Sequence, residues 1–147
     1  HGTEVVFSCG GKIYTSAAEA AAKANGKVIG VDVDQTAQIN GYGAGMHVTS
    51  AMKGLGATVN ACLAAIQNGS FEAEYAGKVS ALGLVSGTDL AANYVGLPTD
   101  TWVMKNFKVA DYKKMVADVF AGKTKISNAI DKDPAVSIKL NKYPNIK

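Results

Sequence analysis

Two apolar runs separated by an alanine-rich segment occupy the first 34 residues, and this alternation constrains the fold more than any other feature. Residues 3–9 form a short apolar run that ends at Gly10 and Gly11. Residues 17–24 are strong helix formers, and residues 27–33 form a second apolar run. Such runs are typical of strands covered on both faces of a parallel sheet. The pattern predicts an α/β fold with a mostly parallel sheet and flanking helices.

Short signals indicate where the helices begin and end. Ser16 and Glu19 have the spacing of a capping box, which predicts that the first helix begins after Ser16. A second helix is expected over residues 53–68, with Lys53 in its first turn and Gly69 as its stop. We expect this helix to pack inward through an apolar stripe that consists of Leu55, Val59, Leu63 and Ile66.

The remaining segments carry weaker signals. Residues 36–45 are polar and contain three glycines, which favours a loop, and a short extended piece follows at 48–50. The apolar runs 78–85 and 90–97 are separated by Ser-Gly-Thr-Asp, which predicts a hairpin. The last expected elements are an amphipathic helix and two short extended pieces in the tail, over residues 109–121 and 123–147 respectively.

Composition excludes several classes of protein. The net charge is +3, the basic residues are scattered, and all of them are lysines, so no nucleic-acid surface is indicated. No apolar stretch approaches the roughly 20 residues that span a bilayer. Cys9 and Cys62 lack the spacing of a metal site or redox motif, and we expect two buried free thiols. No metal and no cofactor is predicted.

Charged side chains are expected at one edge of the sheet. Parallel sheets bind ligands beyond the carboxyl ends of their strands, where Gly10, Gly11, Asp32 and Asp34 all fall. A carboxylate accepts both hydroxyls of a vicinal diol, and a lysine such as Lys53 donates to the same oxygens and keeps the carboxylate ionised. This arrangement suits a ribose or another sugar. Equally, an Asp in this position often only caps the following loop.

One enzyme hypothesis also fits this segment. Mostly apolar residues followed by Asp32-x-Asp34-x-Thr36 are similar to the motif of haloacid-dehalogenase-like phosphotransferases. That resemblance implies Asp32 as the nucleophile and Asp34 as the general acid/base. Lys53 is available as the required lysine, but no acidic pair follows an apolar strand to hold magnesium. His47, the only internal histidine, is expected to be structural.

Four segments, in order along nearly the whole chain, carry a resemblance to a known family. They are Val-Val-Phe-Ser-Cys-Gly-Gly (5–11), Val-Ile-Gly-Val-Asp-Val-Asp-Gln (28–35), Val-Thr-Ser-Ala-Met-Lys (48–53) and Tyr-Val-Gly-Leu-Pro (94–98). Together they resemble the basic membrane protein (BMP) family, which consists of purine-nucleoside-receptor-like, solute-binding lipoproteins of ABC importers with a type I periplasmic-binding fold of two lobes.

The resemblance implies a non-enzymatic protein that binds a nucleoside through its ribose. Asp32 matches the ribose carboxylate of the family and Lys53 the lysine that supports it. Gly10 and Gly11 match a glycine turn that lets the backbone approach the ligand. Asp34 belongs to the motif, but we expect it to act in loop or hinge structure. The implied partners are the ligand and a membrane permease, and the implied location is extracytoplasmic with a lipid anchor outside this chain.

The chain also departs from the family pattern. Lys12-Ile13 follows the glycine turn where Thr-Gly is usual, and Asn93 stands where glycine is common. The match covers only the carboxyl-terminal half of such a protein. We therefore expect residues 1–49 in the second lobe, 50–107 in the first, and 108–147 as a returning helix and tail.

A chain divided in this way is expected to expose apolar faces of both lobes. It would be soluble with the missing half, by exchange of elements with another copy, or by repacking into one compact domain. A further hypothesis is an α/β module with no ligand of its own.

Overall fold

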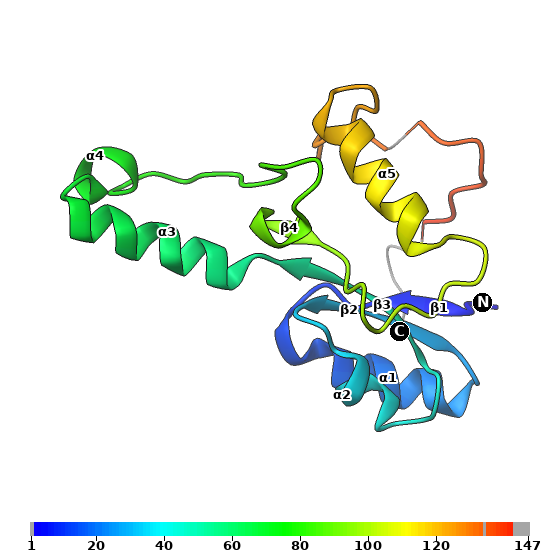
Figure 1. Cartoon of the computed structure of the whole chain (residues 1–147). Coiled ribbons are helices and arrows are strands. Elements are labelled where there is room, and N and C mark those ends of the chain that lie inside the picture. Colours follow the sequence, from blue (N-terminus) through cyan, green and yellow to red (C-terminus); the bar gives the residue numbers. More distant parts are fainter. Residues whose placement is uncertain (1, 134, 143–147) are drawn as a thin grey trace.

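The computed structural model describes residues 2–133 and 135–142, and within them the chain forms one four-stranded open sheet. The strand order is β1-β2-β3-β4, with β1, β2 and β3 parallel and β4 antiparallel to β3 (Figure 1). The predicted α/β class with a mostly parallel sheet is confirmed. The strands are β1 (Val5–Phe7), β2 (Lys27–Asp32), β3 (His47–Lys53) and β4 (Val95–Gly96).

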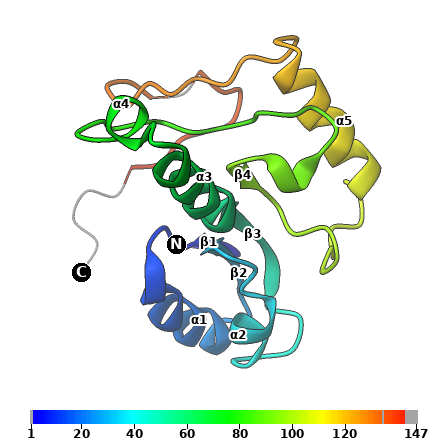
Figure 2. The same cartoon turned by 60° about the vertical axis from the view of Figure 1, so that its left-hand side comes forward.

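The helices lie on both sides of this sheet and beyond its end. Helices α1 and α2 cover one face and α5 lies on the other side, while α3 and α4 extend away from the sheet (Figures 1 and 2). Two 3-10 turns, η1 and η2, complete the regular structure, at Gly11–Ile13 and Leu90–Ala92. The helices are α1 (Tyr14–Lys23), α2 (Thr36–Asn40), α3 (Leu55–Asn68), α4 (Phe71–Glu74) and α5 (Val109–Phe120).

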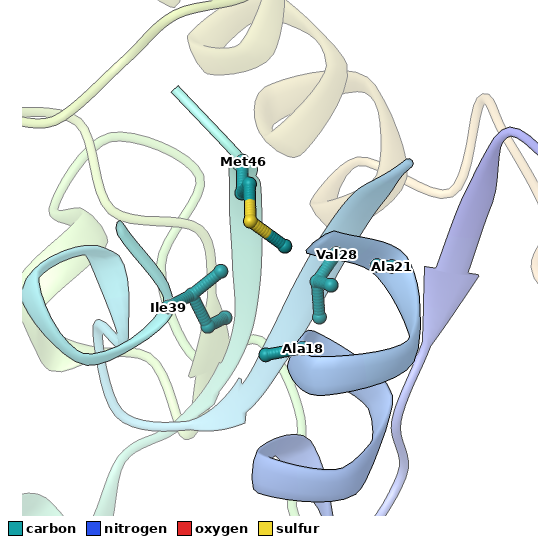
Figure 3. Packing of buried hydrophobic residues seen from close by; sticks show 5 residues of the cluster. All are labelled: Ala18, Ala21, Val28, Ile39 and Met46. Carbon is teal, nitrogen blue, oxygen red and sulfur yellow. The ribbon is translucent and has the colours of Figure 1, made fainter. Parts of the chain in front are cut away.

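The hydrophobic core is small and lies between β2 and the two helices that cover it. Val28 of β2 and Ile39 of α2 are fully buried, and Ala18 of α1 packs against them. Alanines on the inner side of α1 bring that helix close to the sheet, as Figure 3 shows. Ala21 and Met46 complete the cluster. This core fixes the amino-terminal strand-helix-strand unit on which the candidate site stands.

The capping box expected at Ser16 is wrong. Helix α1 begins at Tyr14, and Ser16 lies inside it. The preceding turn η1 passes directly into α1, so the helix already has hydrogen-bonded turns before Ser16. The end of the helix agrees with the sequence, because Asn25 adopts a left-handed conformation (φ 53°) and the Gly26 amide donates to the Ala21 carbonyl.

The loop expected over residues 36–45 is partly a helix. The Asp34 carboxylate accepts a hydrogen bond from the Thr36 amide at 3.0 Å, which stabilises the first turn of α2, and Ile39 anchors it in the core. The extended piece expected at 48–50 is the longer strand β3. Lys53 is therefore the last residue of a strand rather than part of a helix, and α3 begins at Leu55.

The expected hairpin is also wrong. No strand occurs in residues 78–85, and β4 pairs with β3 instead of with that segment. The Asn93 side chain replaces part of the expected ladder, because its Oδ1 accepts from the amides of Val85 and Ser86 at 2.7 and 2.9 Å. The Ser-Gly-Thr-Asp turn itself forms, with Ser86 Oγ accepting from the amides of Thr88 and Asp89.

Helix α3 does not pack its apolar stripe inward. The stripe residues are 49–59% exposed, and they are Leu55, Val59, Leu63 and Ile66. A single residue, Gly54, joins β3 to α3, and its amide donates to the Tyr94 carbonyl at 2.8 Å. A Cβ at Gly54 would lie 2.7 Å from the Asn93 carbonyl oxygen. This tight junction directs α3 away from the sheet, so the stripe has no covering element within the described residues.

The carboxyl-terminal part agrees only in its helix. Helix α5 forms as expected and buries Tyr112 and Val116. The described tail residues up to 142 contain no strand, and Pro134 and residues 143–147 of the expected extended pieces lie outside the described residues.

Both cysteines are free, but the expectation of buried thiols is wrong, because Cys9 lies exposed after the end of β1 and Cys62 half-buried on the surface of α3. No helix within residues 2–133 and 135–142 has the length and apolar character to cross a membrane.

Replacing Ile39 by Ala tests whether this small core holds the domain together. Ile39 is fully buried, so Ile39→Ala should lower the free energy of unfolding by about 3 kcal/mol. Ile130 is fully exposed, and Ile130→Ala should change it by less than about 0.5 kcal/mol. Urea denaturation followed by circular dichroism measures both. Equal effects of the two substitutions would contradict the assigned core.

Candidate functional site

An ion pair between Asp32 and Lys53 joins the carboxyl ends of two parallel strands. The Lys53 ammonium nitrogen lies 2.7 Å from Oδ1 of Asp32. The Asp32 side chain is 28% exposed and that of Lys53 62%, although Oδ1 of Asp32 itself is buried beneath the contact. The hydrogen bond from Lys53 to this carboxylate, together with its negative charge, raises the pKa of the Lys53 ammonium. The two residues expected to act together are therefore in contact.

The backbone of Asp32 makes this contact possible. In a regular strand Asp32 would share the face of Val28, which packs against α1, whereas Lys53 shares the opposite face with Ala51. Asp32 instead has φ 70°, a left-handed conformation that breaks the alternation. Such a conformation costs a non-glycine residue about 1–2 kcal/mol. The chain accepts this strain at the point where the carboxylate turns towards Lys53, and strain of this kind is typical of functional sites.

Lys53 lies at the boundary between two cavities. A cavity of about 430 Å³ on one side has Asp34, Lys53, Thr99 and Asp100 among its polar lining residues. On the other side an apolar groove of about 650 Å³ runs between the sheet and α5. Both volumes lie in the range of small-molecule sites. Lys53 therefore places the ion pair next to enough space for a small organic ligand, although Asp32 itself lines neither cavity.

Asp34 has a different environment from Asp32. Its Oδ1 accepts from the Thr36 amide and from Thr36 Oγ1, at 3.0 and 2.5 Å, and its Oδ2 accepts from Thr101 Oγ1 at 2.8 Å. Burial raises the pKa of this carboxyl, but the hydrogen bonds from Thr36 and Thr101 outweigh burial and leave the pKa below its ordinary value. Asp34 therefore ties the start of α2 to the segment after β4.

His47 is buried and hydrogen-bonded through both ring nitrogens. Thr36 Oγ1 lies 2.9 Å from Nδ1, and Ser50 Oγ lies 2.9 Å from Nε2. The hydroxyl hydrogen of Thr36 goes to Asp34, so Thr36 accepts a hydrogen bond from His47 Nδ1–H. Ser50 accepts from the Gln35 amide and donates to Nε2. These directions assign a neutral imidazole with its proton on Nδ1.

The contact between Ser50 and His47 has the distance of a nucleophile and its base, but its environment does not suit catalysis. Ser50 is fully buried and His47 is 2% exposed, so no substrate reaches the serine hydroxyl. Burial lowers the pKa of His47, and the charge of Asp34 only partly opposes this effect. The structural role expected for His47 fits this geometry.

Gly10 and Gly11 form the turn that leaves the carboxyl end of β1. Gly10 has φ 153°, and a Cβ at this position would lie 2.7 Å from the Cδ1 atom of Ile13. Gly11 opens the turn η1 that leads into α1. Both glycines lie beyond the strand that neighbours β2, at the edge of the sheet that carries Asp32. Cys9, just before them, lines the same groove as Lys53.

Sequence reasoning missed the partners that support the site. The Asp-x-Thr spacing of Asp34 and Thr36 is a local signal for a side-chain cap and could have been recognised. Ser50 was visible only as a strand residue, and Thr101 is 67 residues from Asp34 in sequence. Nothing local predicts such a distant contact.

Comparison with known proteins identifies no similar protein. Searches against protein families, curated proteins and solved structures found no match to this chain. In the part of the chain that the structure describes, no group of three or more His, Cys, Asp or Glu side chains is placed to hold a metal ion.

Substitutions at Asp32 test its strained backbone. Asp32→Asn keeps a residue that tolerates the left-handed conformation, whereas Asp32→Val introduces a β-branched residue that does not. Both variants lose the ion pair. The free energy of unfolding of Asp32→Val should therefore be lower than that of Asp32→Asn by about 1–2 kcal/mol, the cost of the left-handed backbone. Asp32→Gly should relieve the strain. Urea denaturation of the three variants gives the order, and equal stability of Val and Asn would exclude a left-handed Asp32.

The neutral, buried His47 predicts a loss of stability in mild acid. Because burial lowers the pKa of His47 in the folded state, the unfolded state binds more protons below about pH 6.5, and stability falls as the pH decreases. Asp34 acts in the same direction at lower pH, since its pKa is also lowered by folding. Thermal melting between pH 7 and pH 5 should show this decrease. His47→Gln should flatten this decrease. A pH dependence that His47→Gln leaves unchanged would contradict a buried neutral imidazole.

Proposed function

We propose that this chain is part of a solute-binding protein of an ABC importer and binds a nucleoside, with a purine nucleoside favoured, through its ribose. The observation that carries the proposal is the ion pair between Asp32 and Lys53 at the carboxyl edge of a parallel sheet. The resemblance of four sequence segments to the BMP family agrees with this interpretation. On this proposal the protein is not an enzyme, and its partner is a membrane permease.

The chemistry of the ion pair supports a diol ligand. A carboxylate with one oxygen held by an ammonium still has lone pairs free for two hydroxyl donors. The Lys53 ammonium carries three N–H donors, so it can bind a ligand hydroxyl in addition to Asp32. Vicinal hydroxyls of a ribose match this set of donors and acceptors. Gly10 and Gly11 at the same edge leave room for a ligand, since neither carries a side chain.

The separate environments of the two carboxylates favour binding over phosphoryl transfer. A phosphotransferase of the haloacid-dehalogenase type would need Asp34 free to exchange a proton with the substrate. Both oxygens of Asp34 instead accept hydrogen bonds from Thr36 and Thr101, and its lowered pKa keeps it ionised. Asp32 contacts Lys53 instead, and this arrangement suits a binding anchor better than a nucleophile that works with Asp34 as its acid.

The exposed helix α3 supports a two-lobe arrangement. In this proposal residues 1–49 and the returning residues 108–147 belong to the second lobe, and residues 50–107 belong to the first. With these bounds the change of lobe falls within β3, shortly before Gly54 turns the chain away from the sheet. Residues that complete the pocket on the other side of the ligand would then come from the remainder of the first lobe, and the full protein would be lipid-anchored outside the cytoplasm.

Nucleoside binding tests the proposal. A panel of purine and pyrimidine nucleosides, with 2′-deoxynucleosides as the diol-deficient controls, is titrated by calorimetry into the natural full-length protein that contains this chain. A purine ribonucleoside should bind at least tenfold more tightly than its 2′-deoxy analogue, which corresponds to about 1.4 kcal/mol. Asp32→Asn and Lys53→Ala should each weaken binding at least tenfold.

The chain offers a matched control for these variants. Lys114 and Asp118 form another exposed ion pair on α5, so Lys114→Ala and Asp118→Asn should leave affinity unchanged. Unchanged affinity in both Asp32→Asn and Lys53→Ala would refute the assigned site. Magnesium-dependent release of phosphate from simple esters, abolished by Asp32→Asn, would favour the phosphotransferase instead.

A further inference from the structure

Two apolar surfaces of this chain lack a covering element within the described residues. The first, which we call the arm, is the stripe of α3 formed by Leu55, Val59, Cys62 and Ile66, with Leu63 beside it. These positions lie within about one face of a helix with 3.6 residues per turn. Helix α3 contains no charged residue over its 14 positions. An uncharged helix with an exposed apolar face is a surface that favours association.

The second surface is the apolar groove between the sheet and α5. Phe7, Val31 and Ala51 contribute from the three parallel strands, and Met115 and Val119 from α5. Parallel strands are normally covered by helices on both faces, whereas here α1 and α2 cover one face and α5 only part of the other. The groove, at about 650 Å³, marks the place where a further helix would pack.

The arm of one molecule cannot fill its own groove. Gly54 is fixed against the segment before β4 by the hydrogen bond from its amide to the Tyr94 carbonyl and by its close approach to Asn93. Helix α3 therefore leaves the end of β3 pointing away from the sheet, as Figure 1 shows. Its main packing partner is the short helix α4. A second molecule, in contrast, can present its arm to the groove without any change at Gly54.

We propose that two copies of this chain associate by exchanging arms, each α3 lying in the apolar groove of the other copy. Arm and groove match in character, because the groove lining is almost wholly apolar and the arm is uncharged. Exchange related by a two-fold axis buries both surfaces of both copies and leaves no arm free.

The size of the surfaces is sufficient for a stable dimer. The large side chains of the arm are about half exposed, at 49–59%. Side chains of this kind present on the order of 400 Å² on each arm, and two arms with the groove surfaces that they cover reach about 1,200 Å², the lower end of the range of specific interfaces. The exchange does not require nucleoside binding, but it competes with the two-lobe arrangement proposed above, in which the remainder of the first lobe would lie against α3. Lys53 lines the same groove, so an exchanged arm would lie beside the ion pair.

Measurement of mass in solution tests the exchange. Sedimentation equilibrium of this chain, from low to high micromolar concentration, should give twice the chain mass of 15.2 kDa. Val59→Lys on the arm and Met115→Lys in the groove should each give a monomer, since each buries a charge in an apolar interface. Both positions are 40% exposed or more within one chain, so circular dichroism should show an unchanged fold. Ala64→Lys, on the opposite side of α3, should remain a dimer.

Two experimental results would overturn the proposal. Wild-type chain that stays monomeric at every concentration would show that another occupant, such as a further segment of the same protein, is needed to cover these surfaces. A dimer that Val59→Lys disrupts and Met115→Lys leaves intact would mean that two arms pair with each other. Either result excludes exchange into the groove.

The two free cysteines provide a second readout that needs no variant. Cys62 lies on the arm and Cys9 lines the groove, so exchange places the two thiols on facing surfaces of different copies. Mild oxidation by copper phenanthroline in air removes two electrons and two protons from a thiol pair, and oxygen accepts them. Mass spectrometry should find Cys9 joined to Cys62 between copies, and Cys9→Ser should abolish the crosslink. A product dominated by Cys62 joined to Cys62 would refute the exchange.

Discussion

The buried hydrogen-bond chain around His47 is the interaction on which the rest of the site depends. It runs from the Asp34 carboxylate through Thr36 to His47 and on to Ser50, so it joins the end of β2, the start of α2 and the strand β3. Each hydroxyl both donates and accepts, and this order leaves one tautomer for the imidazole. A fully satisfied polar network of this kind stiffens its surroundings. It holds β2 and β3 in the register that brings Asp32 close to Lys53.

Two carboxylates that are one residue apart acquire different roles because the backbone changes between them. Asp32 is left-handed and carries its side chain to Lys53, whereas Asp34 lies in the following turn and caps α2. Parallel strands end at a common edge, so the place of Asp32 at that edge was predictable, whereas Lys53 was expected in a helix and reaches the same edge as the last residue of β3. The left-handed backbone of Asp32 was not predictable. It is needed for contact with Lys53 on the opposite face of the sheet, and that face is known only from the structure. The partner Thr101 was beyond prediction for a simpler reason, its distance along the chain.

Among the secondary structure elements, those that depend on local patterns were predictable and those that depend on a distant partner were not. The strands before Gly10 and after Gly26 and the helix α5 follow from apolar runs and periodicity. Helix α2 begins where the Thr36 amide donates to Asp34, and in place of the expected hairpin the side chain of Asn93 accepts from the amides of Val85 and Ser86. For α3 the helical period was correct, but the direction of packing depends on the junction at Gly54, which no periodicity reveals.

One face of the sheet is covered by helices and the other is partly open, and the ion pair lies beside the open face. Covering that face would therefore affect both the stability of the fold and ligand binding at the ion pair. The face towards α1 and α2 holds the core, with Val28 and Ile39 fully buried. The opposite face keeps apolar side chains such as Phe7 half exposed, so covering it releases hydrophobic free energy at about 25 cal/mol per Å². Lys53 lines the groove on this face. Whatever covers the groove, whether an arm of a second copy or another segment, therefore also removes water from one side of the ion pair. Because charge interactions strengthen as water is excluded, closure of this face and tight binding at Asp32 are expected to reinforce each other.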